Sequence, residues 1–231
     1  MTNLHYFGDK AIPQPRRTNQ VSLIRSMLLA ASIGASPMLA TAAIAQQAAP
    51  APAGITAAQA TKSMRDLWVD HIFWVRNVVV ETLSHNQAAA AVAEAEVVAD
   101  AHRIAAAIEP FYGKPASDKL FTLLAGHYGA IKQYLQAGTN QTAKNTAMKA
   151  GLTNADQIAV FLAGANPNLP VETLKALLDA HISQHAEQID QLRAKQYSAE
   201  AKTWEMMKSH IYIIADALTG ALVKQFPRKF V

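Results

Sequence analysis

One stretch decides the fold of this 231-residue chain: LWVDHIFWVR, residues 67–76. At about 100° per residue, an α-helix places the apolar side chains of this stretch and of its neighbours on one face. The members of that face are Met64, Leu67, Trp68, His71, Trp74, Val75 and Val78. We therefore expect a long amphipathic helix that directs His71 towards the protein core.

Three later apolar stripes have histidines near their centres in the same way. These histidines are His127 in a helix expected over 117–137, His181 and His185 in a helix over 171–195, and His210 in a helix over 198–226. His181 and His185 are four residues apart and therefore lie one turn apart on the same face. The arrangement around His71 is thus repeated in three further helices.

The complete pattern predicts an all-α fold. Apolar periodicity and Pro, Gly or polar stop signals divide the chain into about five long helices and two short ones. The expected long helices cover 57–83, 87–109, 117–137, 171–195 and 198–226, and the short ones cover 141–150 and 154–163. Short connections imply antiparallel neighbours, so we predict an up-and-down helical bundle over residues 56–231.

The positions of the histidines along their helices suggest a binding site. His71, His127, His181, His185 and His210 all fall near the midpoints of their expected helices, and midpoints of antiparallel helices share one level of a bundle. Burying five imidazoles is costly unless they bind each other, a metal or a ligand. Because imidazole is the commonest metal-binding side chain, we predict that these five residues bind a metal ion.

The residue types narrow the choice of metal. The chain has no cysteine, so thiolate ligands are absent, and no glutamate pattern of a di-iron site lies on the apolar stripes. Imidazole ligands suit copper, zinc or iron, and Met206 and Met207 beside His210 favour copper slightly. A haem is an alternative that would have to be non-covalent, because the Cys-x-x-Cys-His attachment motif is missing.

Two other functions remain open at this stage. The histidines could hydrogen-bond to each other inside a structural or interaction module, or the same pocket could bind a small ligand or a substrate. The chain shows no phosphate-binding loop, no Gly-x-Ser-x-Gly elbow and no His-Glu-x-x-His motif. We therefore assign no catalytic residue, and a role in metal handling or sensing is favoured over catalysis.

The N-terminus has the features of a secretory signal peptide. Arg25 ends a basic segment, an apolar run follows over 27–40, and Ala43-Ile44-Ala45 offers a small-x-small cleavage site. The run is shorter than the roughly 20 residues of a membrane span. We predict a signal peptide over 1–45, a disordered Pro/Ala tether over 46–55, and export to the periplasm or the medium.

Removal of the signal peptide changes the charge of the protein. The full chain has 21 basic and 17 acidic residues, whereas residues 46–231 have 17 and 16. This near-neutral balance gives no electrostatic basis for binding nucleic acid or a membrane surface. The expected partners are a metal ion or a small ligand.

Several segments resemble a family of exported bacterial helical-bundle proteins of unknown function. The resemblance is carried by residues 67–76, Phe111-Tyr112-Gly113, residues 154–162, Asn166-Pro167-Asn168 and residues 210–227. Some members have been labelled glycosyltransferase or acetylglutamate kinase, but those activities need an α/β nucleotide-binding fold that this sequence does not predict. The resemblance implies that the family's helix histidines correspond to His71, His127, His181 and His210, without His185.

Overall fold

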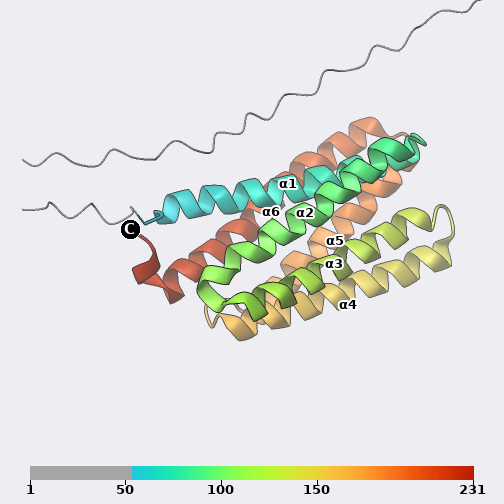
Figure 1. Cartoon of the computed structure of the whole chain (residues 1–231). Helices are drawn as coiled ribbons and strands as arrows, with labels where there is room; N and C mark the ends of the chain where they lie inside the picture. The colour runs from blue at the N-terminus through green and yellow to red at the C-terminus, as the bar shows by residue number, and fades with distance from the viewer. Residues whose placement is uncertain (1–53) are drawn as a thin grey trace, which may run out of the picture. The chain divides into compact units, whose positions relative to one another are not determined.

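The computed structural model describes residues 54–231 and consists of helices, with no strand in this range (Figure 1). The elements are α1 (Ala57–Leu83), α2 (Gln87–Tyr112), α3 (Lys114–Gln136), α4 (Gln141–Ala165), α5 (Val171–Arg193), α6 (Tyr197–Gln225) and a 3-10 turn η1 (Pro227–Lys229). The predicted all-α bundle is therefore confirmed. The signal peptide predicted over 1–45, and residues 46–53 of the predicted tether, lie outside the described residues.

The six long helices form a closed ring. Each helix packs against the next one along the chain, and α6 also packs against α1. Successive helices run antiparallel (Figure 1), so α1, α3 and α5 point in the same direction. α5 additionally contacts both α1 and α3 across the ring. These three helices carry His71, His127, His181 and His185, so the topology brings four histidines towards the centre of the bundle.

Local sequence signals explain several helix ends. Thr56 and Gln59 form a reciprocal capping box that starts α1, and the side chains of Asn86 and Asn140 cap α2 and α4. Gly113 joins α2 to α3 with a φ of 82°, a conformation that glycine adopts at little cost. Tight caps of this kind keep the connections short and the neighbouring helices antiparallel.

The two short helices predicted over 141–150 and 154–163 are one continuous helix, α4. Gly151 was expected to end the first of them, but it is buried inside α4. A Cβ atom at this position would lie 2.9 Å from Ile182 Cγ1 and 3.5 Å from Ala130 Cβ. The glycine therefore permits close packing of α4 against α5 and α3, and it does not act as a stop signal.

Two boundaries near Pro110 also differ from the prediction. Pro110 was expected to end its helix, but α2 continues to Tyr112 with the proline in its last turn. The following helix begins at Lys114, with Pro115 in its first turn, where the missing backbone N–H costs nothing. Ser117 is therefore a buried residue inside α3.

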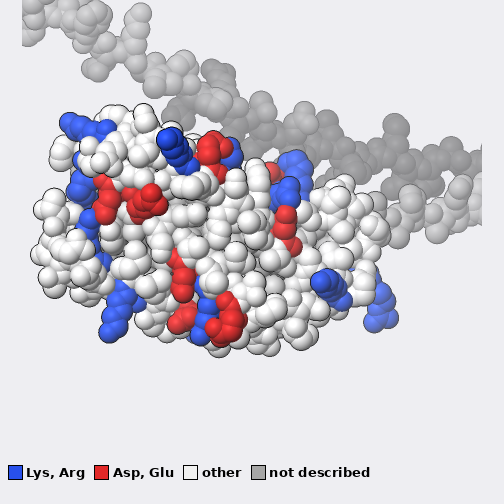
Figure 2. Space-filling model, turned by 180° about the vertical axis from the view of Figure 1, so that it is seen from behind, with Lys and Arg blue, Asp and Glu red and all other residues white. Residues whose placement is uncertain are grey.

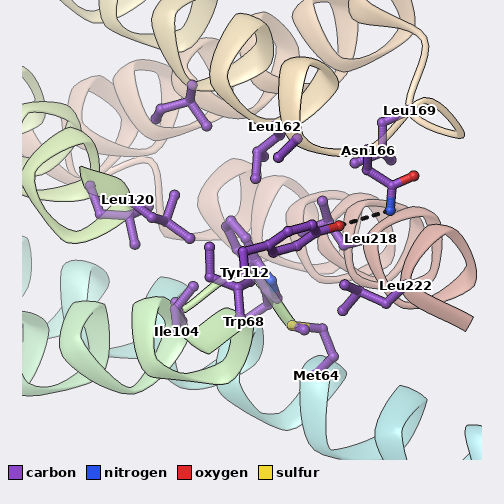
Figure 3. Close-up of a pocket in the computed structure, with 14 residues that line it drawn as sticks. Met64, Trp68, Ile104, Tyr112, Leu120, Leu162, Asn166, Leu169, Leu218 and Leu222 are labelled. Atoms are coloured by element: carbon purple, nitrogen blue, oxygen red, sulfur yellow. Dashed lines mark hydrogen bonds between the residues drawn. The ribbon is translucent and has the colours of Figure 1, made fainter. Parts of the chain in front are cut away.

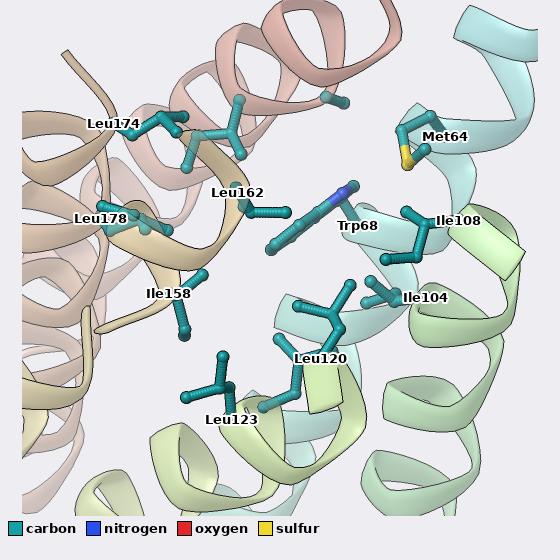
Figure 4. Packing of buried hydrophobic residues seen from close by; sticks show 14 of the residues in the cluster. Met64, Trp68, Ile104, Ile108, Leu120, Leu123, Ile158, Leu162, Leu174 and Leu178 are labelled. Atoms are coloured by element: carbon teal, nitrogen blue, oxygen red, sulfur yellow. The ribbon is translucent and has the colours of Figure 1, made fainter. Parts of the chain in front are cut away.

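The core has two apolar clusters with the histidine layer between them. One cluster surrounds Trp68 and contains side chains from all six helices (Figure 4). The other contains Val75, Ile131 and Ile189 at the opposite end of α1, α3 and α5. Along α3, for example, Leu124 belongs to the first cluster and Ile131 to the second. His127 lies between Leu124 and Ile131 along α3, so the polar layer interrupts an otherwise apolar interior.

The surface shows no concentration of one charge on the face drawn in Figure 2, where basic and acidic side chains alternate among uncharged residues. Several of the charged residues form pairs between helices, such as Arg65 with Asp216 at 2.5 Å. Within residues 54–231, no helix combines the length and the apolar composition needed to cross a membrane.

Candidate metal centre

Three histidines converge in the middle of the bundle. His71 from α1 meets His181 and His185 from α5, and one ring nitrogen of each lies within 4.8 Å of the others. The ring centroids of His71 lie 5.7 Å from His181 and 5.9 Å from His185. All three side chains are buried, with at most 5% of their surface exposed. The i, i+4 spacing on α5 supplies two imidazoles, and the packing of α1 against α5 supplies the third.

The α5 pair shows how the nitrogens are oriented. His181 Nε2 and His185 Nε2 lie 3.2 Å apart, at hydrogen-bond distance. Three nitrogens bound to one metal at about 2.0–2.1 Å would lie roughly 3.3–3.6 Å from each other. The pair already has this separation. Movement of His71 by about 1 Å would complete a three-nitrogen site.

His127 from α3 lies beside this group and is stacked against it. Its ring is almost parallel to that of His181, at 8° with centroids 5.6 Å apart. Neither ring nitrogen of His127 has a hydrogen-bond partner, and His181 Nδ1 also has none. Buried polar atoms without partners are uncommon and call for a specific explanation, such as an ion or a water molecule. His127 is therefore a fourth imidazole with free lone-pair capacity next to the group of three.

His210 occupies a different environment. It lies on α6 at the expected depth, but its Nε2 is 2.8 Å from the carbonyl oxygen of Leu177 and donates a hydrogen bond to it. The side chain is half-buried and is not part of the group of three. Its neighbour Met207 is fully buried in the apolar cluster, whereas Met206 is exposed. The structure thus brings together four of the five histidines singled out in the sequence and places the fifth against a backbone carbonyl.

Burial keeps the four core imidazoles neutral. It lowers the pKa of His71 to about 3, with a further contribution from His127. Burial also lowers the pKa of His127 to about 4, although nearby Asn154 opposes this shift. The pKa values of His181 and His185 are lowered by burial first and then by the neighbouring imidazoles. Because only a neutral imidazole has a free lone pair, these nitrogens can bind a metal without competition from protons at neutral pH.

Asn154 stands where the sequence predicted the start of a short helix, but it lies inside α4 beside the histidine layer. Its Nδ2 donates a hydrogen bond to the Leu123 carbonyl at 3.1 Å, while its Oδ1 has no partner. A Cβ atom on Gly126 would lie 2.9 Å from Asn154 Nδ2, so Gly126 makes room for this amide. The only sequence signal for this close approach of Asn154 was Gly126, a glycine next to His127 inside a helix.

The cavities around the layer are small. A cavity of about 10 Å³ reaches His185. A second, apolar cavity of about 30 Å³ is bordered by Trp68 (Figure 3). The Trp68 ring also contacts His71 edge-on. A hydrogen bond from Asn166 Nδ2 to the Tyr112 hydroxyl at 3.0 Å closes one side of the apolar cavity. Pockets for organic ligands have volumes of about 300–1,000 Å³. These cavities hold about one water molecule each, which suits an ion better than an organic substrate.

A buried ion pair and a buried aspartate were not predicted from the sequence. Arg76, one turn after His71, makes a bidentate ion pair with the buried Glu200 at 2.6 and 2.9 Å, and Gln188 donates to the same carboxylate. This pair connects α1, α5 and α6. Asp100 on α2 is fully buried, and burial raises its pKa to about 6. By sequence pattern alone, the Arg76–Glu200 pair and Asp100 would be interpreted as ordinary surface charges.

Comparisons with known proteins add no assignment: no family model, no curated protein and no solved structure matches this chain. The functional argument therefore rests on the geometry of the histidines.

Proposed function

We propose that this protein binds one transition-metal ion in the centre of its bundle, through His71, His181 and His185. His127 lies beside these three residues and is available as a further ligand. The observation that carries the proposal is the convergence of three buried, neutral imidazoles within 4.8 Å. The proposed role is metal handling, storage or sensing. The cavities next to the site are too small for an organic substrate, which disfavours an enzyme or a small-ligand binder at this position.

A purely structural role explains the histidines less well. In that case each buried ring should satisfy its own hydrogen bonds, as His210 does with Leu177. Neither nitrogen of His127 makes a hydrogen bond of good geometry, although the Asn154 side chain lies close enough to raise the pKa of the ring. An apolar side chain of similar size would fill the same space without leaving polar atoms unsatisfied. The presence of an imidazole at residue 127 is better explained by a ligand that its nitrogens bind.

The direct test is metal analysis of untagged protein together with its thermal unfolding. We expect one bound ion per chain and a higher unfolding temperature, since a ligand at 100 times its dissociation constant stabilises by about 2.7 kcal/mol. His71→Ala should abolish both effects. His210→Ala is the matched control and should retain them, because this ring donates to a backbone carbonyl outside the group of three. Absence of any stoichiometric metal would overturn the proposal.

We also propose that the protein acts outside the cytoplasm and belongs to the exported helical-bundle family that its sequence resembles. The signal-peptide pattern in residues 1–45 supports the export. Cell fractionation followed by N-terminal sequencing tests it. A mature protein that starts at Gln46 in the periplasm or the medium is expected, and an unprocessed cytoplasmic protein would contradict the proposal.

A further inference from the structure

The charge environment of the histidine site is unusual for a buried metal centre. The group formed by His71, His181 and His185 contains no carboxylate among residues 54–231. In agreement with this geometry, the pKa values of these three histidines and of His127 are shifted by burial, by neighbouring imidazoles that include His210 and, for His127, by the Asn154 amide, and by no carboxylate. Glu200, a buried acid on α6, is already neutralised by its ion pair with Arg76 on α1. A metal bound here would therefore be surrounded by neutral ligands only.

The absence of a counter-charge distinguishes between metals. The cost of moving an ion from water into an apolar interior rises with the square of its charge, so a divalent ion pays about four times as much as a univalent one. Divalent sites reduce this cost with a carboxylate ligand or with a bound hydroxide in an open fourth position. Here the described residues place no carboxylate in the group of three, and the cavity of about 10 Å³ that reaches His185 is not lined by His71 or His181. That volume is at the lower limit for a single water-sized ligand.

The number and arrangement of the ligands agree with a univalent ion. His181 and His185 place their Nε2 atoms 3.2 Å apart, and His71 approaches from the opposite helix to give three nitrogens around one point. Copper(I), a closed-shell ion, accepts two or three ligands and does not need a fourth, whereas structural zinc sites are almost always four-coordinate. His127 could approach as a further ligand without adding charge.

We propose that the metal of this site is copper in its univalent state, held by one ring nitrogen each of His71, His181 and His185. This inference rests on the proposed function and names the ion that the same site prefers. It does not depend on the methionines of α6, since Met206 is exposed and Met207 lies within the apolar cluster. The preference arises from the neutral ligand set and the small enclosed space.

The experiment compares metals on the untagged full chain. Copper(I) is supplied anaerobically as its acetonitrile complex and titrated against a chromogenic copper(I) chelator, and zinc(II) and cobalt(II) are titrated in parallel. We expect one copper(I) per chain, bound at least about 100-fold more tightly than either divalent ion. X-ray absorption should show a univalent edge with nitrogen neighbours. His71→Ala should reduce copper(I) affinity by at least about tenfold, and His210→Ala should leave it unchanged.

A second measurement does not depend on the folding of a variant. If the missing counter-charge limits divalent ions, zinc(II) binding to the unaltered protein should tighten when fluoride, an anion no larger than a water molecule, is added, while copper(I) binding should not change. His127→Asp introduces a carboxylate beside the site and should shift the preference towards zinc(II). Zinc(II) that binds as tightly as copper(I), without added anion, would overturn this inference and leave the proposed function intact. Failure of all three metals to bind would overturn both.

Discussion

The buried imidazoles should make the stability of the metal-free protein fall steeply between pH 7 and pH 5. His71 and His127 have pKa values of about 3 and 4 in the folded state, against about 6.5 in an unfolded chain. In this pH window the unfolded state takes up protons that the folded state does not. Stability is therefore complete above the unfolded pKa and is lost as the pH falls below it.

The size of the effect follows from these values. Moving from pH 7 to pH 5 costs about 2 kcal/mol for His71 and a similar amount for His127. Asp100 acts in the opposite direction, because its pKa of about 6 lets the folded state take up a proton and adds about 1 kcal/mol. The net loss from these three groups is about 2–3 kcal/mol, and His181 and His185 add to the loss.

Urea unfolding, followed by circular dichroism in the presence of a chelator, measures this loss. His71→Leu should make the pH dependence shallower by about 2 kcal/mol over the same window, since one titrating group disappears. Asp100→Asn should make it steeper by about 1 kcal/mol. His102→Gln is the control, because this histidine is exposed and stacks on Phe121 at the surface. We expect it to leave the slope unchanged.

A stability that stays constant between pH 7 and pH 5 would refute this reasoning. It would mean that the core imidazoles take up protons in the folded protein over the same pH range as in the unfolded chain. A loss that remains at full size in His71→Leu would assign the pH dependence to other groups. Saturating metal should raise the stability by a similar amount at pH 7 and at pH 5, because the core imidazoles of the folded protein stay neutral over this window, so the loss between the two pH values should persist.

Four further substitutions test the packing and the buried ion pair. His127→Leu should stabilise the metal-free protein by about 1–3 kcal/mol in urea unfolding, since it removes two unpartnered nitrogens; a loss would show that the ring is satisfied. Gly151→Ala should cost about 1–3 kcal/mol because its Cβ would clash with Ile182, whereas Gly164→Ala, with open space around it, should gain about 0.5–1 kcal/mol. Glu200→Gln should cost about 2–3 kcal/mol because it leaves a partly exposed arginine without its partner; an unchanged unfolding midpoint would contradict the pairing.

Helix periodicity predicted the fold class and most of the elements because burial of one face is a local property of the sequence. The same reasoning divided α4 at Gly151, since a glycine inside a helix has two explanations. It can end the helix, or it can admit a neighbouring side chain, and only the position of Ile182 distinguishes them. Pro110 presented the same ambiguity one turn before the end of α2.

The candidate site was partly predictable for a related reason. The face and depth of His71, His127, His181 and His185 follow from their positions along amphipathic helices, and all four are buried in one layer. His210 shares the depth and the apolar stripe, but the rotation of α6 places its ring against the Leu177 carbonyl. A difference of this kind depends on how two helices are rotated about their own axes, which neither helix encodes alone.

The sequence by itself determined that this protein is a bundle of long helices with histidines at mid-depth, because helical periodicity and burial are set residue by residue. The tertiary structure decided which of those histidines meet. The ring of six helices brings α1 and α5 into contact, and the nitrogens of His71, His181 and His185 come within 4.8 Å only because of that contact. The distances between side chains on different helices are properties of the packed core, and they determine whether five separate imidazoles become one candidate metal centre.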